Sequence, residues 1–201
     1  MMSHQPTRRF TLLAGFASAA LSLAGCNKPA SPVFQGMDLT DHAYVKDFRL
    51  TDTDGRERTL ADFKGKLVML FFGFTQCPDV CPTALARAVA IKGLLGVDGE
   101  RLQVLFVTVD PERDSAAVLK AYMQVFDPGF IGLYGTLQQT RETANAFKVH
   151  YKKVPTGASY TMDHSTFSYV FDFSGNLRLA LRHNQSAEEC AGDLRQLVAS
   201  T

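Results

Sequence analysis

The fold is decided by residues 66–109, which read KLVMLFFGFTQCPDVCPTALARAVAIKGLLGVDGERLQVLFVTV. The nearly continuous apolar run from Lys66 to Phe74 is typical of a strand that is buried on both faces of a sheet. Apolar side chains then recur at helical spacing from Thr83 to Leu95, and Leu102 to Val109 form a second buried strand. A strand, a helix and a strand in this order predict parallel neighbours in an α/β sheet.

The rest of the chain continues this alternation and adds a hairpin on each side of it. The predicted elements, in chain order, are a hairpin over 44–60, a helix capped by Asp114, a short strand at Leu133 and Tyr134, a helix over 138–149, a hairpin over 167–181 and a closing helix over 187–198. A terminal hairpin and helix after βαβ units predict the α/β class and a thioredoxin-like fold with an N-terminal β-hairpin extension.

The beginning of the chain has the layout of an export signal. Arg8 and Arg9 precede an apolar stretch over residues 10–23, which is shorter than the roughly 18 to 20 apolar residues of a membrane-spanning helix. Residues 1–25 are therefore predicted to be a signal peptide of the lipoprotein type. An uncleaved signal anchor is the alternative, and both interpretations place the following residues outside the cytoplasm.

The tetrad Leu23-Ala24-Gly25-Cys26 resembles the bacterial lipobox, whose cysteine is lipidated and becomes the mature N-terminus. We therefore expect Cys26 to tether an exported lipoprotein to a membrane of the bacterial cell envelope, facing the periplasm. Residues 26–43 are predicted to be a flexible tether, and residues 44–201 one domain. The domain has no run of basic residues, which disfavours a nucleic-acid partner.

Chemically active side chains gather at one edge of the predicted sheet. Cys77 and Cys81 follow the first buried strand, and Asp110 follows the second. His164 precedes the last hairpin, whose first strand is antiparallel in a thioredoxin-like sheet. Because the carboxyl ends of parallel strands meet the start of that antiparallel strand at the same edge, we expect these residues to converge.

The spacing of Cys77 and Cys81 is i, i+4, which on a helical turn places both sulfur atoms on one face, about 6 Å apart along the axis. The pair by itself fits a structural disulfide, a redox pair or a metal-binding pair. His164 completes a set of two thiols and one imidazole. Thiolates favour Cu(I) or zinc, and imidazole accommodates either oxidation state of copper.

Three motifs resemble those of the SCO/SenC proteins. They are FTQCPDVCPT at 74–83, VDPERD at 109–114 and DHS at 163–165, and the resemblance covers roughly residues 40–200. It implies that Cys77, Cys81 and His164 bind a copper ion, as Cu(I) or Cu(II). It also implies delivery of copper to the dinuclear site of cytochrome c oxidase and reduction of the recipient's cysteines. The expected partners are the copper-site subunit of that oxidase and an upstream copper carrier or thiol reductant.

Other residues are weaker candidates. Asp110 either orients the metal site or belongs to a turn, and Asp163 either orients His164 or is a solvated surface residue. Cys190 lies on the apolar stripe of the last helix and is expected in the core. Met162 has a thioether that could approach Cu(I), but packing is the favoured interpretation.

Two other functions would use the same cysteines, namely a membrane-tethered thiol–disulfide oxidoreductase and a thiol peroxidase. Ordinary thioredoxin-type oxidoreductases have two residues between their cysteines, whereas three separate Cys77 from Cys81. A peroxidase needs a cation near its cysteine, and the loop around Cys77 has no clear arginine. Copper binding requires both thiols to be reduced, so a Cys77–Cys81 disulfide formed on oxidation is expected to abolish the site. We therefore expect a metallochaperone rather than an enzyme.

Overall fold

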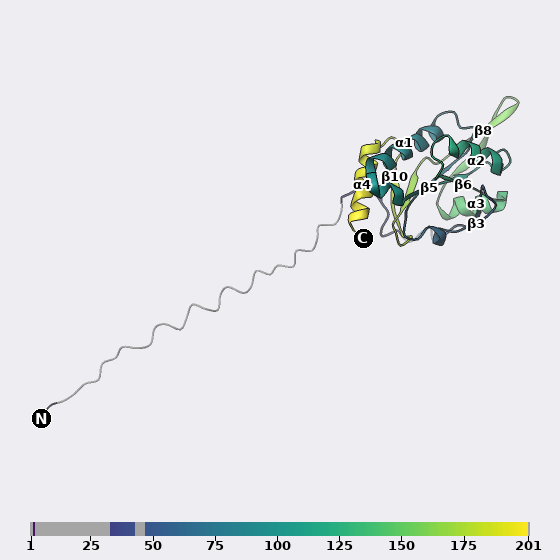
Figure 1. Cartoon of the computed structure of the whole chain (residues 1–201). Coiled ribbons are helices and arrows are strands. Elements are labelled where there is room, and N and C mark those ends of the chain that lie inside the picture. The colour runs from purple at the N-terminus through teal and green to yellow at the C-terminus, as the bar shows by residue number, and fades with distance from the viewer. Residues whose placement is uncertain (1, 3–32, 43–46, 201) are drawn as a thin grey trace. The chain divides into compact units, whose positions relative to one another are not determined.

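The computed structural model describes Met2, residues 33–42 and residues 47–200 (Figure 1). Apart from Met2, these residues belong to one compact unit, Val33–Thr201. The predicted signal peptide and the predicted lipid attachment site, Cys26, lie outside the described residues.

A mixed eight-stranded sheet forms the centre of this unit. Its parallel centre consists of β4, β5 and β6, and β9 lies antiparallel beside β4. This arrangement agrees with the predicted α/β class and with the parallel pairing of the two buried strands. The strands, in spatial order, are β1 (Met37–Asp38), β10 (Leu177–Leu181), β9 (Ser168–Phe171), β4 (Leu67–Gly73), β5 (Leu102–Thr108), β6 (Ile131–Tyr134), β2 (Leu50–Asp52) and β3 (Glu57–Arg58).

Helices cover both faces of the sheet, which explains why every residue of β4 and β5 is buried. Phe72 packs edge-on against Phe147, which follows α3, with ring centroids 5.2 Å apart. Phe106, on the opposite face, packs against Tyr122 of α2 at 5.8 Å. The described helices are η1 (Leu60–Phe63), α1 (Val80–Leu95), η2 (Gly96–Arg101), α2 (Ala116–Gln124), α3 (Leu137–Ala146) and α4 (Ala187–Ala199).

The predicted N-terminal hairpin is present as β2 and β3, and β2 pairs with β6, so that β3 is the edge strand on this side of the sheet. The predicted tether over 26–43, however, extends too far into the chain. The backbone N–H groups of Gln35 and Gly36 donate to the buried carboxylate of Asp193 at 2.8 and 2.7 Å, and β1 pairs with β10. Residues 33–42 are therefore part of the folded unit, because a carboxylate and an open strand edge satisfy their backbone groups.

The prediction that Asp114 caps the second helix is wrong. The N-cap residue of α2 is Ser115, whose side chain accepts a hydrogen bond from the backbone of Val118. Asp114 is buried and accepts hydrogen bonds from two threonines, Thr75 and Thr108. Ser115 is the next residue along the chain, and the tertiary contacts of Asp114 leave the capping role to it.

Helix α1 begins at Val80, three residues before the predicted start at Thr83. This start places Cys81 in the first helical turn. Pro82 is tolerated there because the first N–H groups of a helix have no partner inside the helix.

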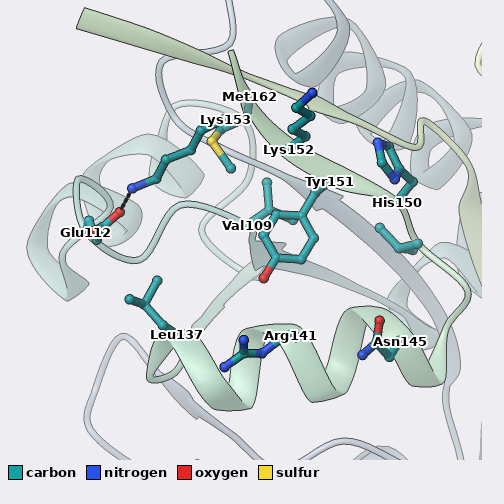
Figure 2. Close-up of a pocket in the computed structure, with 11 residues that line it drawn as sticks. Val109, Glu112, Leu137, Arg141, Asn145, His150, Tyr151, Lys152, Lys153 and Met162 are labelled. Carbon is teal, nitrogen blue, oxygen red and sulfur yellow. Dashed lines mark hydrogen bonds and ion pairs between the residues drawn. The ribbon is translucent and has the colours of Figure 1, made fainter. Parts of the chain in front are cut away.

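A hairpin that the sequence does not reveal stands out from the body of the domain (Figure 1). It consists of β7 (Tyr151–Thr156) and β8 (Ser159–His164), which form a separate two-stranded sheet. Most of β7 is exposed, so its sequence lacks the apolar alternation of a half-buried strand. Residues of β7 and α3 line a pocket between them, into which Tyr151 of β7 points (Figure 2). His164, predicted to precede the strand of the last hairpin, is the last residue of β8.

Candidate metal centre

The structure brings the three predicted ligands together. Cys77 lies in the loop after β4, Cys81 in the first turn of α1 and His164 at the end of β8. Their ligand atoms all lie within 4.8 Å of one another, and Cys81 Sγ is 3.6 Å from His164 Nε2. One ion can contact all three, because metal–sulfur and metal–nitrogen bonds are about 2.0 to 2.3 Å long.

Close packing at the end of β4 determines where Cys81 lies. A Cβ atom on Gly73 would sit 2.8 Å from Cys81 Sγ and 2.7 Å from the Phe106 ring. Only a residue without a side chain lets the sulfur approach the strand this closely. Cys81 is fully buried, whereas Cys77 is partly exposed, so an approaching molecule reaches Cys77 first.

The ring of His164 is held with one nitrogen toward the cysteines. Its Nδ1 lies 2.8 Å from the carbonyl oxygen of Ser165. A carbonyl can only accept, so Nδ1 carries a hydrogen, and in the tautomer that binds a metal ion the lone pair is on Nε2, which faces Cys81. The rings of Phe71 and Phe74 pack edge-on against the imidazole at 6.0 and 5.9 Å. The carbonyl of Ser165 thus performs the orienting role that the sequence suggested for Asp163, which is exposed on β8.

The pKa values of the two thiols are shifted in opposite directions. The hydrogen bond from Cys81 is the main cause that lowers the pKa of Cys77 to about 5, and backbone N–H groups of Asp79 and Cys81 add to it. The same contact, with burial, raises the pKa of Cys81 far above its ordinary value. At neutral pH the reduced pair therefore consists of a Cys77 thiolate and a Cys81 thiol. A metal ion that binds both sulfurs must displace the proton of Cys81.

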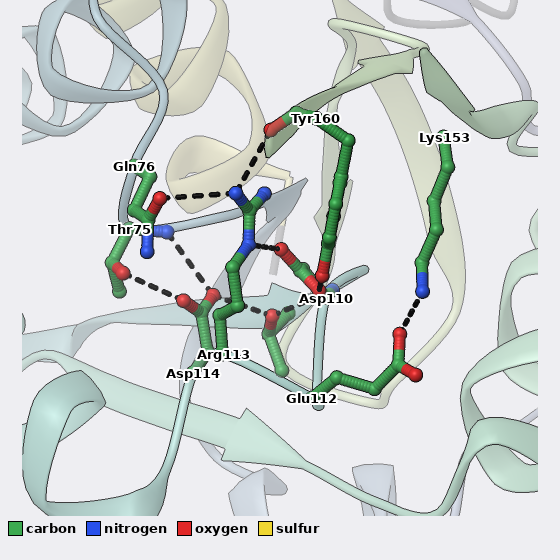
Figure 3. Close-up of polar contacts among 9 residues, drawn as sticks. Thr75, Gln76, Asp110, Glu112, Arg113, Asp114, Lys153 and Tyr160 are labelled. Carbon is green, nitrogen blue, oxygen red and sulfur yellow. Dashed lines mark hydrogen bonds and ion pairs between the residues drawn. The ribbon is translucent and has the colours of Figure 1, made fainter. Parts of the chain in front are cut away.

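Asp110, which the sequence suggested as a residue that could orient the metal site, contacts the hairpin that carries His164 (Figure 3). Its buried carboxylate accepts hydrogen bonds from the Tyr160 hydroxyl at 2.8 Å and from Arg113 Nε. The Arg113 guanidinium also stacks 3.7 Å from the Tyr160 ring centroid and donates to the Tyr160 carbonyl at 2.8 Å. A further bond of 3.0 Å joins Arg113 to Gln76, beside Cys77. We call Asp110, Arg113 and Tyr160 the hairpin clamp.

Asp114 fixes the other end of the cysteine loop (Figure 3). It accepts hydrogen bonds from the Thr75 backbone at 3.0 Å, the Thr75 hydroxyl at 2.6 Å and the Thr108 hydroxyl at 2.6 Å. Burial is the main cause that raises the pKa of Asp114. The predicted VDPERD motif thus supports both the cysteine loop and the hairpin. The role of Tyr160 had no signal in the sequence.

A shallow and mainly apolar pocket of about 240 Å³ lies in front of the cluster. Cys77, Pro78, Val80, Met162 and His164 are among the residues that line it. Met162 is buried, in agreement with the packing role predicted for it. The three ligands therefore leave one side of the cluster accessible to another molecule.

Cys190 is a fully buried free thiol of α4 and lies in the hydrophobic core, as predicted. The donor set of the candidate centre is accordingly two thiols and one imidazole. Such a set fits Cu(I), Cu(II) or zinc, and the accessible side is suited to exchange of the ion.

Comparison with known proteins agrees with this geometry. A sequence model of the SCO1/SenC family matches residues 37–199. An SCO2-like protein of Rickettsia felis is 40% identical over 132 residues, which cover 64% of this chain and 64% of that protein. The mitochondrial SCO2 homolog of Bos taurus is 37% identical over 158 residues, covering 77% of this chain and 59% of that protein. The chain thus spans less than two thirds of the length of these two curated relatives.

Solved structures show the same fold. The structure of Bradyrhizobium japonicum ScoI with copper bound has 38% identity and a TM-score of 0.71, and the match covers 77% of this chain and 99% of that chain. Apo Sco1 from Thermus thermophilus has 38% identity and a TM-score of 0.74, and the match covers 84% of this chain and 99% of that chain. The predicted thioredoxin-like fold is confirmed by these neighbours. From the family match and these similarities we conclude that the chain belongs to the SCO1/SenC family.

Proposed function

We propose that this protein binds one copper ion through Cys77, Cys81 and His164 and delivers it to the dinuclear copper site of a cytochrome c oxidase. The observation that carries the proposal is the cluster of two sulfurs and one imidazole nitrogen within 4.8 Å. Structures of Bradyrhizobium japonicum ScoI and of yeast Sco1, which are 38% and 35% identical to this chain, hold copper.

The residues suit copper as a cargo. Two sulfur ligands stabilise Cu(I), while Nε2 of His164 adds a ligand that Cu(II) also accepts. The ordered contact between Nδ1 and Ser165 keeps that nitrogen available. Because the ligands leave one side accessible through the apolar pocket, a ligand of the recipient can enter before the ion leaves.

The same pair can reduce a recipient whose copper-binding cysteines have become oxidised. The Cys77 thiolate attacks a disulfide of the recipient and forms a mixed disulfide, releasing one recipient thiolate. Cys81 loses its proton and attacks Cys77, which yields the Cys77–Cys81 disulfide and the second recipient thiolate. Two electrons pass to the recipient, and a thiol reductant must then restore the pair. The low pKa of Cys77 and the adjacent thiol of Cys81 support this activity.

The proposed location is the bacterial cell envelope, with a lipid on Cys26 and the domain facing the periplasm. Support comes from the arginines, apolar stretch and lipobox-like tetrad of residues 8–26. In the described part of the chain, Val80–Arg101 alone has the length and composition of a membrane span. That segment consists of α1 and η2, and α1 packs in the core beside α4.

A copper titration of the reduced protein tests the proposal. We expect one equivalent of copper to bind tightly, Cys77→Ser and Cys81→Ser to abolish binding, and His164→Ala to weaken Cu(II) binding. Cys190→Ala is the matched control, since it removes a buried thiol of α4 that is not part of the cluster of Cys77, Cys81 and His164. Binding that survives Cys77→Ser and His164→Ala unchanged would exclude copper as the cargo of this cluster. Rapid reduction of insulin by a protein without copper affinity would favour the alternative, a thiol–disulfide oxidoreductase.

A further inference from the structure

A second pocket lies behind the hairpin that carries His164. It has a volume of about 450 Å³ and separates α3 from β7 (Figure 2). Arg141 and Asn145 line it from α3, and Lys152 and Lys153 line it from β7, with the Lys152 side chain directed away from α3. These four side chains are exposed, so the pocket opens to solvent along its length. An open groove of this kind fits a segment of another protein better than an enclosed small molecule.

The charges of this pocket are unbalanced. Three permanent cations, Arg141, Lys152 and Lys153, line it, but Glu112 is its sole carboxylate. Glu112 forms an ion pair with Lys153. Arg141 and Lys152 form no hydrogen bond or ion pair with any residue that the structure describes. Lys152 lies opposite Asp163 of β8 and points away from α3, so Arg141 is the unpaired cation among the lining residues that faces the groove and attracts an anionic group.

Other lining residues add directional and apolar contacts. The Asn145 amide and the Tyr151 hydroxyl are hydrogen-bonding groups on opposite walls of the pocket (Figure 2). Val109 and Met162 provide an apolar surface between them. Together these groups suit a glutamate or aspartate side chain, whose carboxylate meets Arg141 while its methylene groups lie on the apolar surface.

The pocket is close to the candidate metal centre. Met162 lines both this pocket and the apolar pocket in front of Cys77. Tyr151 of β7 pairs directly with His164 of β8. A protein segment that lies in the groove would thus be one hairpin strand away from a ligand of the ion.

We propose that this cationic groove docks an acidic segment of the protein that exchanges copper with Cys77, Cys81 and His164. The proposal rests on the proposed copper-carrying function, because it assigns the groove to that partner. The groove orients the partner by charge, and its edge beside Met162 brings the partner to the accessible side of the metal cluster.

Nuclear magnetic resonance titration of the reduced ¹⁵N-labelled protein with a capped hexaglutamate peptide tests the groove. We expect saturable shifts centred on Arg141 and Asn145, which weaken as salt is added. Arg141→Glu should lower the affinity about tenfold, because charge reversal replaces attraction with repulsion at short range. Lys64→Glu is the matched control, since it changes the net charge equally at an exposed residue outside the groove.

Three results would overturn the docking proposal. They are shifts spread over the whole surface, an equal loss of affinity in the Lys64→Glu control, and an identical shift pattern with inorganic phosphate, which would indicate a small-anion site. Copper titration of the same variants keeps the two proposals apart. If the protein binds no copper, the proposed function fails whatever the peptide does. If Arg141→Glu binds copper normally but loses the peptide, the groove is a docking surface distinct from the ligands.

Discussion

The hydroxyl group of Tyr160 donates a 2.8 Å hydrogen bond to the buried carboxylate of Asp110. This bond joins the hairpin that ends in His164 to the loop that follows β5. The protruding hairpin is otherwise a two-stranded sheet, and such a unit is only marginally stable by itself. The hairpin clamp therefore determines where the imidazole lies relative to the two sulfurs.

Tyr160→Phe should weaken the histidine contribution to the metal site. It removes one hydrogen bond to a buried carboxylate. The free energy that holds the hairpin against the domain should therefore fall by about 1 to 3 kcal/mol. We expect weaker Cu(II) binding and a changed electron paramagnetic resonance spectrum, with a smaller effect on Cu(I), which the thiolates hold. Tyr151→Phe, on the same hairpin, is the control and should leave the spectrum unchanged. Identical Cu(II) spectra for Tyr160→Phe and the unmodified protein would contradict this role.

The alkylation rate of Cys77 by iodoacetamide should depend on pH with a midpoint near 5. A thiol reacts as its thiolate, and the pKa of Cys77 is lowered to about 5, so the rate should rise through that pH and be constant by neutral pH. Cys81→Ala removes the main hydrogen bond to the thiolate and should move the midpoint upward. Cys190→Ala should leave it unchanged. A midpoint at the ordinary value of a thiol in the unmodified protein would refute the proposed thiolate–thiol pair.

Gly73→Ala should disturb the metal site from within the sheet. The new methyl group would lie 2.8 Å from Cys81 Sγ and 2.7 Å from the Phe106 ring. We expect a loss of about 1 to 3 kcal/mol in unfolding free energy and weaker copper binding. Gly93→Ala is the control, because its methyl group would have nothing within 4 Å and lies on α1. That change should stabilise the protein by up to about 1 kcal/mol. Equal stability of the two variants, measured by denaturant unfolding, would argue against this packing constraint.

Asp193→Asn should release the segment before β1. An amide offers one oxygen where the carboxylate accepts from both Gln35 and Gly36, so a backbone N–H loses its partner. We expect the free energy of unfolding to fall by about 1 to 3 kcal/mol and proteolysis within residues 33–42 to become faster. Glu188→Gln, an exposed change on the same helix, is the control. Unchanged cleavage of this segment in Asp193→Asn would show that β1 holds it without the carboxylate.

Mild oxidation by diamide should join Cys77 and Cys81 and abolish copper binding. Their sulfur atoms lie within 4.8 Å, and both are free thiols. Mass spectrometry should detect a loss of two hydrogen atoms and a peptide that links the two residues, while buried Cys190 remains unmodified. Dithiothreitol should restore binding. An oxidised protein that still binds copper with unchanged affinity would mean that one of the sulfurs is dispensable.

Local patterns in the sequence predicted the centre of the fold and the ligands. The apolar runs at 66–74 and 102–109 became β4 and β5, because burial on both faces requires continuous apolar side chains. The order of strands placed Cys77, Cys81 and His164 at one edge of the sheet, and the structure has them there. The closing helix carries Cys190 into the core at the predicted spacing.

Local sequence patterns did not predict the contacts between segments that are far apart in the chain. Strand β7 is largely exposed and β8 is partly buried, so no clear apolar period marked them. Asp114 and Asp193 both accept hydrogen bonds from segments far away in the chain, Thr75 and Gln35 respectively. Nothing local to either aspartate predicts such a partner.

The sequence by itself therefore determined the α/β core, the edge of the sheet at which the cluster forms and the three residues of that cluster, Cys77, Cys81 and His164. Tertiary structure alone decided the hairpin clamp, the orientation of His164 by Ser165 and the attachment of residues 33–42. The reason is physical: hydrophobic periodicity is a property of neighbouring residues. Hydrogen bonds of buried polar groups, in contrast, depend on where the folded backbone brings distant donors and acceptors together.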